Sequence, residues 1–228
     1  MTAPETALTI KRNFTRTAIK FVNQFMNLPT GNVCDAQGRV GALDYRIKPV
    51  GGAFQFCGTA LTVDSGPRDN LAAWASLEFA KPGDIVLIAT GGHLASSVVG
   101  DLYVGMAKNA GVAAIVTDGV VRDLPGINAV GIPVFARGIC PNSPWKNGPG
   151  RVGLPIVIGG VTANAGDIVV GDQDGVVVVA RRSAAAVADG LKAVLAKEKK
   201  MESSVKAGTT VPGWLQEAYK AKGVKYLD

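Results

Sequence analysis

Three charged residues have types and a spacing that suit chemistry on a small anionic molecule. Asp101 follows Gly100 at the expected start of a helix, and the pair Arg122–Asp123 follows after twenty intervening residues, just beyond the next expected strand. If the helix folds back onto that strand, these ends meet in one pocket. One carboxylate can then bind a metal, the guanidinium can bind an anion, and the other carboxylate can assist a proton transfer. The set predicts metal-assisted carbon–carbon chemistry on a small oxo acid.

Each of these residues also has a plain structural explanation. Asp101 could simply complement a helix dipole, or the free N–H groups of that first turn could bind a carboxylate; spacing alone leaves both open. Arg122–Asp123 could be a surface ion pair, which contributes little to stability. However, ligand sites in α/β sheets lie beyond the carboxyl ends of strands, and Arg suits carboxylate recognition while Asp suits Mg²⁺. The position of Arg122–Asp123 beyond a strand end therefore favours a ligand-binding role over a surface ion pair.

The positions of apolar runs predict the elements that must hold these residues. Residues 85–90, 112–117 and 132–136 are expected to be buried strands, with a helix that ends at Gly111 between the first two. A strand, a helix and a strand at this spacing form a βαβ unit with parallel pairing, and the fold class is α/β. After a Gly/Pro-rich stretch, short strands are expected at 152–158, 167–171 and 175–180, and a long helix at 182–204.

Length and composition predict one well-buried core over residues 1–228, or at most two small domains. Hydrophobic residues make up 47% of the chain and the mean hydropathy is +0.22, which argues against disorder. No apolar run approaches the roughly 20 residues that cross a bilayer, and the N-terminus lacks a secretion signal, so a cytoplasmic protein without membrane contact is expected. The tail, 205–228, keeps large apolar side chains and is expected to pack on its own domain or on a neighbouring subunit.

Several function classes are disfavoured by what the sequence lacks. The net charge of +6 is spread along the chain rather than clustered with aromatics, which argues against a nucleic-acid partner but suits anionic substrates. The string G148-P-G-R-V-G153 precedes a strand instead of opening a helix, so a dinucleotide site is rejected. Its single histidine, His93, lies in a turn without a serine nucleophile motif. The three cysteines are far apart, which indicates neither a disulfide nor a zinc site.

The segment 91–123 resembles the family that contains class II 4-hydroxy-4-methyl-2-oxoglutarate / 4-carboxy-4-hydroxy-2-oxoadipate aldolases and the regulator of ribonuclease E activity A. The similarity extends to 30–35, 132–138, 155–161 and 165–179, and so covers most of the chain. This resemblance implies a single-domain α/β/β sandwich of the "swivelling" type, with a central βαβ unit and flanking helices. It also implies homotrimers, or hexamers of two trimers, with active sites at subunit interfaces.

The resemblance implies a role for each residue of the opening set. Asp123 would ligate Mg²⁺ or Mn²⁺, mostly within a shell of water, and Arg122 would contact the oxo and carboxylate oxygens of the substrate. Asp101 would position or activate a water that shuttles the proton. Glu198 of a neighbouring subunit is the match for an acidic residue near the metal, with Glu202 a weaker match. The carboxylate at the pyruvate end would be bound by the backbone of Gly100, Asp101, Leu102 and Tyr103.

The expected function is a divalent-metal-dependent aldolase. It would cleave a 4-hydroxy-2-oxo acid such as 4-hydroxy-4-methyl-2-oxoglutarate to pyruvate and a second oxo acid, in the degradation of aromatic compounds, and would also decarboxylate oxaloacetate. Many aldolases of the family carry an acidic residue three positions after the metal-binding Asp, where this chain has Gly126, so the exact substrate is open. His93 and Gly126 are expected to set substrate choice.

Two alternatives remain beside the aldolase. One is a non-catalytic regulator of a ribonuclease that acts by protein binding, and the other is a related metal-dependent lyase or hydrolase acting on another oxo acid. The regulator branch of the family typically lacks an intact Arg-Asp pair. Its presence at Arg122–Asp123 therefore favours the enzyme.

Overall fold

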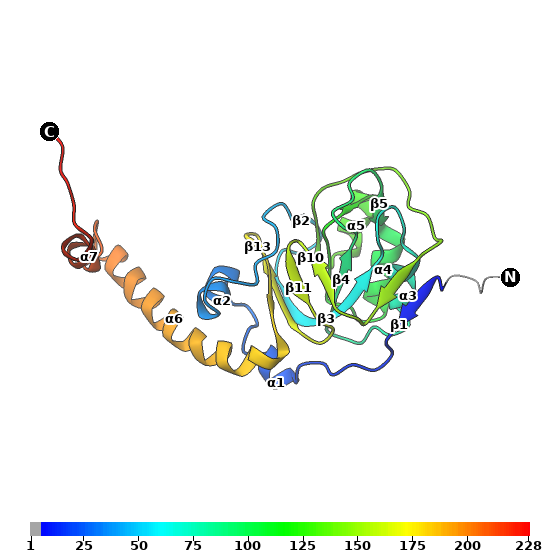
Figure 1. The fold of residues 1–228 in the computed structure, drawn as a ribbon, viewed down its shortest axis with the longest axis horizontal. Coiled ribbons are helices and arrows are strands. Elements are labelled where there is room, and N and C mark those ends of the chain that lie inside the picture. The colour runs from blue at the N-terminus through cyan, green and yellow to red at the C-terminus, as the bar shows by residue number, and fades with distance from the viewer. Residues whose placement is uncertain (1–5) are drawn as a thin grey trace.

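The computed structural model describes residues 6–228, and its central feature is a mixed β-sheet (Figure 1). Within this range the sheet has nine strands, in the order β1-β9-β3-β4-β6-β8-β2, and the hairpin β12–β13 joins the beginning of β3. The strands are β1 (Leu8–Ile10), β2 (Lys48–Gly51), β3 (Phe56–Asp64), β4 (Asp84–Ala89), β6 (Ala114–Thr117), β8 (Val134–Ala136), β9 (Gly150–Val152), β12 (Ile168–Asp172) and β13 (Gly175–Val179).

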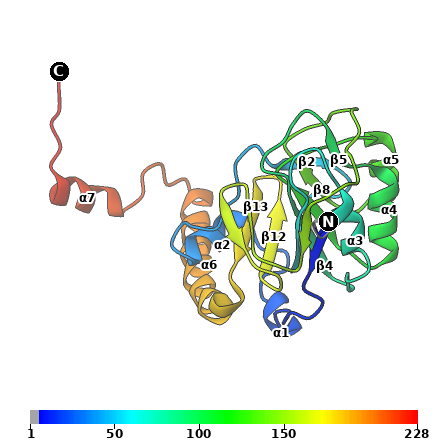
Figure 2. The same ribbon diagram turned by 45° about the vertical axis from the view of Figure 1, so that its right-hand side comes forward.

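One face of this sheet is covered by the helices α3 (Leu71–Ser76), α4 (Asp101–Asn109) and α5 (Leu124–Val130) (Figures 1 and 2). The strands β3, β4, β6 and β8 pair in parallel, so α4 and α5 are crossover connections. The apolar runs expected to be strands are therefore buried on both faces, as is typical of parallel sheets. The predicted βαβ unit is confirmed.

The other face is covered by β-structure, which makes the second β-layer. The hairpin of β10 (Ile156–Ile158) and β11 (Val161–Ala163) packs there together with β12 and β13. Outside this layer, α1 (Ile19–Val22), α2 (Thr30–Ala36) and α6 (Ala184–Lys206) cover β12 and β13 (Figure 2). The predicted α/β/β sandwich with flanking helices is confirmed.

Two stretches differ from the sequence prediction. Residues 152–158 form two strands, because Gly153 turns the chain at a φ of +74° between β9 and β10. The stretch between the Gly91-Gly92 turn and α4, where no strand was expected, contains β5 (Ser97–Val99), which pairs in parallel with β7 (Val120–Val121) as a small separate sheet. Such a three-residue strand has no periodicity of its own and depends on its partner.

The C-terminal region extends away from the body of the molecule (Figures 1 and 2). The long helix α6 begins after a 3₁₀ turn at Arg181–Ser183, and its buried residues all lie between Ala184 and Leu191. Helix α7 (Trp214–Lys222) has no buried residue, and a hollow lined by residues of both helices lies between it and the end of α6. Packing of the tail on a neighbouring subunit stays a prediction. Among the described residues, no helix combines the length and apolarity needed to span a bilayer.

Candidate active site

The small sheet of β5 and β7 explains why the three predicted residues meet. The two strands run in the same direction, with Val99 opposite Val121, and the N–H of Arg122 donates to the carbonyl of Val99 at 3.1 Å. Gly100 and Asp101 follow β5 directly, and Arg122 and Asp123 follow β7. Because parallel strands end at the same edge, both segments emerge side by side. A strand that the sequence analysis did not predict therefore builds the site.

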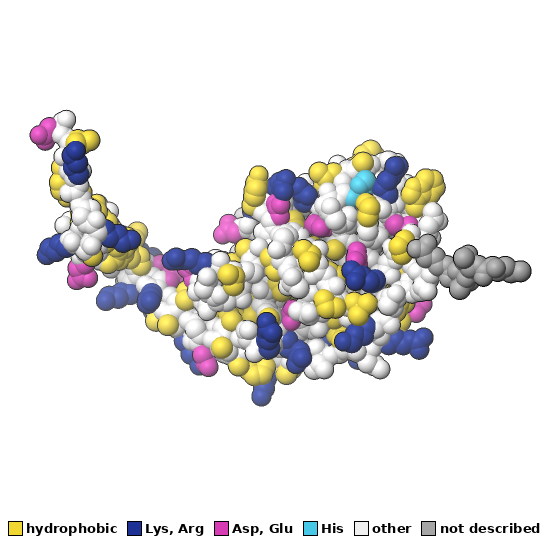
Figure 3. Space-filling model, viewed as in Figure 1, with side chains coloured by type: hydrophobic (Ala, Val, Ile, Leu, Met, Phe, Trp, Pro, Cys, Tyr) yellow, Lys and Arg dark blue, Asp and Glu magenta, His cyan; other side chains and the backbone are white. Residues whose placement is uncertain are grey.

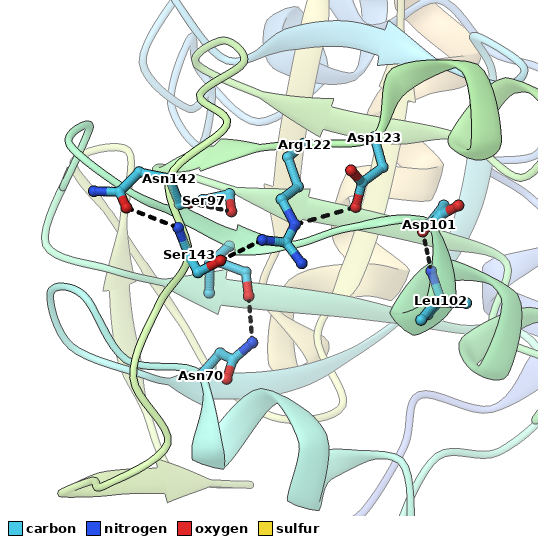
Figure 4. Close-up of polar contacts among 9 residues, drawn as sticks. Asn70, Ser97, Asp101, Leu102, Arg122, Asp123, Asn142 and Ser143 are labelled. Carbon is cyan, nitrogen blue, oxygen red and sulfur yellow. Dashed lines mark hydrogen bonds and ion pairs between the residues drawn. The ribbon is translucent and has the colours of Figure 1, made fainter.

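A cleft of about 110 Å³ opens at this edge (Figure 4). It is lined by all the predicted site residues except Glu198 and by a further group from other segments. The predicted residues are Gly100, Asp101, Leu102, Tyr103, Arg122 and Asp123; the further ones are Asn70, Trp74, Ser97, Val98, Val99, Ser143, Pro144 and Lys146.

Arg122 and Asp123 lie at the mouth of the cleft and contact each other. The Arg122 Nε donates to Asp123 Oδ2 at 3.1 Å, and the Arg122 Nη1 donates to the hydroxyl of Ser143 (Figure 4). Both charged side chains stay partly exposed, at 38% and 43%. The guanidinium is thus oriented on two sides, while part of its surface remains open to an anion.

Asp123 has a backbone conformation that is uncommon for residues other than glycine. Its φ of +61° and ψ of +43° are left-handed, although it is not a glycine. It occupies the N-cap of α5, where an aspartate normally accepts a hydrogen bond from the helix, yet its side chain makes no capping bond. The carboxylate faces Arg122 and Gly100 instead. Unusual backbone at a polar, open position points to a functional site.

Two glycines lie against the carboxylates of the site. A Cβ on Gly100 would collide with the Asp123 carboxylate, and a Cβ on Gly126 would lie 2.6 Å from the Cβ of Asp101. Gly126 is the position at which the family resemblance led us to expect an acidic residue. In this chain its missing side chain leaves room for Asp101.

The first turn of α4 provides part of the expected carboxylate site. The N–H of Leu102 donates to Asp101 Oδ1 at 2.7 Å, so that group is already engaged. The N–H groups of Asp101 and Tyr103 have no acceptor within residues 6–228. The Tyr103 side chain is buried against Trp74, with its hydroxyl 3.2 Å from that of Ser76, and burial raises the pKa of this phenol. Tyr103 can therefore contribute to carboxylate binding only through its backbone N–H.

The donor set for a metal is small and made of carboxylate oxygens. The described residues contain no group of three or more His, Cys, Asp or Glu side chains that could hold a metal ion. Asp123 and Asp101 are the carboxylates that line the cleft. This set fits Mg²⁺, which usually keeps several waters and binds through one or two carboxylates, and does not fit a structural zinc site. The predicted Mg²⁺ or Mn²⁺ is compatible with these residues and stays a prediction.

Glu198 lies away from the cleft of its own chain. It belongs to α6, which covers the opposite side of the sheet from α4 (Figures 1 and 2), and it accepts a hydrogen bond from the Asn32 amide of α2. Glu202 lies one turn further along the same helix. Either residue could reach a cleft of this kind only in another copy of the chain, as the family resemblance implies.

His93 is not among the residues that line the cleft. It lies in the turn after β4, where its N–H donates to Thr90 Oγ1 at 3.2 Å and its Nε2 is buried without a partner in the described chain. A role for His93 in substrate choice is therefore not supported by its position. The cysteines are free and each partly exposed, and burial raises the pKa of Cys57 to about 12.

Eight lining residues were missed by the sequence analysis: three belong to the unpredicted strand β5, and five come from distant segments. Of these five, Asn70 and Trp74 lie at the beginning of α3, and the others lie in the β8–β9 loop (residues 137–149). The only signal for that loop was its position after the carboxyl end of a parallel strand. The loop residues are Ser143, Pro144 and Lys146.

The family was decided by comparison with known proteins. A family model described as RraA-like, Aldolase/RraA, matches residues 30–178, which include the whole cleft. The chain belongs to the RraA-like family. A protein of Halalkalibacterium halodurans, provisionally named a 4-hydroxy-4-methyl-2-oxoglutarate aldolase, is 38% identical over 161 residues, which are 71% of this chain and 77% of that protein.

Solved structures of the RraA-like fold agree with this assignment. An uncharacterized protein of Pseudomonas syringae has a TM-score of 0.75 and 26% identity, covering 86% of this chain and 97% of its own. RraAS2 of Streptomyces coelicolor, described as an unusual member of the RNase ES inhibitor RraA family, has a TM-score of 0.72 and 27% identity, covering 84% and 100%. The similar proteins thus carry two kinds of description, aldolase and ribonuclease inhibitor.

Proposed function

We propose that this RraA-like protein is a divalent-metal-dependent aldolase that releases pyruvate from a 4-hydroxy-2-oxo acid such as 4-hydroxy-4-methyl-2-oxoglutarate, and that it also decarboxylates oxaloacetate. The observation that carries the proposal is the convergence of Asp101, Arg122 and Asp123 in one cleft. The named aldolase relative supports the same class of reaction. Both reactions pass through the enolate of pyruvate, so one site can serve both.

A divalent cation at Asp123, when bound, supplies a Lewis acid that polarises the 2-oxo acid. Arg122 then binds oxygens of the oxo acid with the part of its guanidinium that Asp123 and Ser143 leave free. The N–H groups of Asp101 and Tyr103 bind the carboxylate next to the oxo group, as helix N-termini do for anions. These contacts fix the substrate with its C3–C4 bond in the cleft.

The reaction moves one proton and breaks one carbon–carbon bond. The hydroxyl at C4 gives its proton to a water held by Asp101, the C3–C4 bond breaks, and C4 becomes the carbonyl carbon of the second product. The electron pair remains on the pyruvate part as an enolate, whose charge Arg122 stabilises where it develops. The same water then passes a proton to the enolate carbon, which gives pyruvate. No lysine is needed as a covalent carrier.

A ribonuclease inhibitor is the second candidate, since the similar structure from Streptomyces coelicolor carries that description. An inhibitor that acts by protein binding has no need of an oriented guanidinium, nor of a carboxylate held in left-handed backbone. The formed cleft therefore favours the aldolase. A lyase or hydrolase acting on another oxo acid would use the same cleft and differs only in substrate.

The proposal is tested by measuring pyruvate formation from 4-hydroxy-4-methyl-2-oxoglutarate and from oxaloacetate, with Mg²⁺ and with a chelator. Asp123→Ala should reduce kcat/KM at least a hundredfold, because it removes the proposed metal ligand. Asp189→Ala is the matched control, since that carboxylate is exposed on α6 and pairs only with Lys192.

Turnover that is independent of metal, or an Asp123→Ala enzyme with unchanged activity, would refute the mechanism. If neither substrate is cleaved and the protein instead slows RNA cleavage by a ribonuclease, the inhibitor is the better description. Cleavage of a different oxo acid alone would move the assignment to the third candidate.

A further inference from the structure

The β8–β9 loop extends the small sheet that builds the site. Val121 of β7 bridges Ile139 in parallel; its N–H donates to the carbonyl of Gly138 at 3.1 Å, and its carbonyl accepts from the N–H of Cys140 at 2.9 Å. Val121 thus uses its backbone groups on this loop, whereas the N–H of Arg122 bonds to β5. Strand β7 has a partner on each side, so the backbone that leads into Arg122 is firmly held.

Asn142 fastens the next part of the loop to β5. Its carbonyl accepts from the N–H of Ser97 at 2.9 Å and from the hydroxyl of Ser97 at 2.8 Å. Its side-chain amide donates to the carbonyl of Ala95 at 3.0 Å and accepts from the N–H of Ser143 at 3.0 Å (Figure 4). These bonds leave the loop little freedom at Asn142. Ser143, the next residue, is thereby fixed at the cleft.

Arg122 lies between Ser143 and Asp123 (Figure 4). Its Nη1 donates to the hydroxyl of Ser143, and its Nε donates to Asp123 Oδ2 at 3.1 Å. The two acceptors differ in one respect, because the hydroxyl is neutral and the carboxylate is charged. Only the carboxylate is also the proposed ligand of a metal ion.

The ion pair with Asp123 is therefore weakest when Arg122 is needed. When a divalent cation binds at Asp123, the carboxylate loses much of the negative charge that attracts the guanidinium, and the two cationic groups repel each other. The bond to the neutral hydroxyl of Ser143 does not depend on that charge. Without it, the substrate itself would have to immobilise the long Arg122 side chain, which lowers affinity through lost rotamer freedom.

We infer that Ser143 is a positioning residue for Arg122, and that it holds the guanidinium in place when a divalent cation occupies Asp123. This inference rests on the proposed function and adds to it a residue that acts through Arg122. Asn142 has a supporting part, since it fixes Ser143 to β5. The β8–β9 loop thus determines the direction from which Arg122 meets the oxo acid.

Binding of oxalate, a planar mimic of the pyruvate enolate, tests the inference without turnover. Calorimetry with Mg²⁺ should show that Ser143→Ala binds oxalate about tenfold more weakly than wild type, which is typical of one hydrogen bond to a charged group. Ser143→Thr keeps the hydroxyl and should keep most of the affinity. Ser203→Ala is the matched control: its hydroxyl donates to the carbonyl of Lys199 on the exposed part of α6, and its loss should leave oxalate binding unchanged.

NMR of the Arg122 side chain provides a readout of position that needs no ligand beyond Mg²⁺. The Nε–H signal of Arg122 is assigned by its absence in Arg122→Met. With Mg²⁺ this proton should exchange with water several-fold faster in Ser143→Ala than in wild type, because nothing then holds the guanidinium. Without Mg²⁺ the two proteins should differ little, since Asp123 still accepts from Nε.

Equal exchange of the Arg122 proton in both proteins with Mg²⁺, or equal affinity for oxalate, overturns the inference. In that case wild type and Ser143→Ala should also release pyruvate with the same kcat/KM. Failure of the proposed function gives a different result: neither protein releases pyruvate, while the Mg²⁺-dependent difference in exchange is still measured.

Discussion

Gly100 and Gly126 determine where the carboxylates of the cleft can lie, although neither backbone requires glycine. Gly100 has a φ of −135° and a ψ of −169°, an extended conformation that any residue adopts, and Gly126 lies within α5. What excludes a side chain is the neighbouring carboxylate: Asp123 at Gly100 and Asp101 at Gly126. These glycines are therefore explained by the site and not by the fold.

Gly100→Ala should impair catalysis with little loss of stability. The new Cβ would push the Asp123 carboxylate away from its place beside Arg122, so we expect kcat/KM for pyruvate release to fall at least tenfold. The melting temperature should change by only a few degrees, because the backbone is permitted to alanine. An active Gly100→Ala enzyme with normal metal dependence would show that the Asp123 position is not critical.

Gly126→Ala should act on the other carboxylate. Alanine favours helices over glycine by about 1 kcal/mol, but its Cβ would lie 2.6 Å from that of Asp101 and displace it. If Asp101 holds the water that protonates the enolate, exchange of the pyruvate methyl hydrogens with D₂O should slow markedly, as followed by NMR. Exchange at the wild-type rate would remove Asp101 from that role.

At the level of elements, a buried ion pair fixes the beginning of β4 behind the site. Asp84 is fully buried and accepts from Arg16 Nε at 2.8 Å and Arg16 Nη2 at 2.6 Å. It also accepts from the Thr59 hydroxyl and from the N–H of Lys81, both at 2.9 Å. This one carboxylate connects the N-terminal segment, β3 and the turn that precedes β4.

Removing the Asp84 charge should destabilise the whole chain. Asp84→Ala leaves the Arg16 guanidinium without its partner, and breaking a buried pair in this way costs about 3–5 kcal/mol. Urea denaturation should show the loss as a lower midpoint. Asp189→Ala, which breaks an exposed pair with Lys192, should change the free energy of unfolding by less than about 1 kcal/mol. Equal effects of the two variants would contradict the role assigned to Asp84.

The sequence predicts those elements whose pattern is set by burial alone. The runs that become β4, β6 and β8 are almost entirely apolar, because both faces of a parallel sheet are covered, and α6 was expected within two residues of its observed ends. By contrast, β5 and β7 were missed, since strands of three and two residues have no period to detect. They exist only because each pairs with the other.

The same distinction applies to the site. Asp101 could be predicted because it begins a helix that the sequence indicates, and Arg122 and Asp123 because they lie shortly beyond the expected strand 112–117. Asn70 and Lys146 could not, because their place in the cleft depends on contacts between Asp69 and a loop nearly eighty residues away. Such a pairing of distant loops leaves no trace in local periodicity.

For the whole molecule, the position of α6 separates the two parts of the predicted site. Helix α6, which carries Glu198, covers the opposite side of the sheet from α4 (Figure 1), and the second half of α6 has no buried residue. A helix of this length gains most of its stability from packing, so its free end is suited to contact another copy. We expect the clefts to be completed by neighbouring subunits.

Mixing two inactive variants tests this arrangement. Asp123→Ala and Glu198→Gln chains, each with little activity alone, should regain measurable pyruvate release when they are refolded together, because some clefts receive an intact Asp123 and an intact Glu198 from different chains. Asp123→Ala mixed with the Asp123→Ala/Glu198→Gln double variant should regain none. If the two single variants do not complement each other, Glu198 does not act across subunits.

The left-handed backbone of Asp123 places the carboxylate for catalysis but lowers the stability of the fold. Such a conformation costs a non-glycine residue about 1 kcal/mol, and the aspartate returns nothing to α5 as a cap. Asp123→Gly should therefore unfold at a higher urea concentration than wild type while it loses activity. A protein lineage without selection for turnover could replace Asp123 with a residue that tolerates this backbone conformation. Its folding stability would then rise while its catalytic activity was lost.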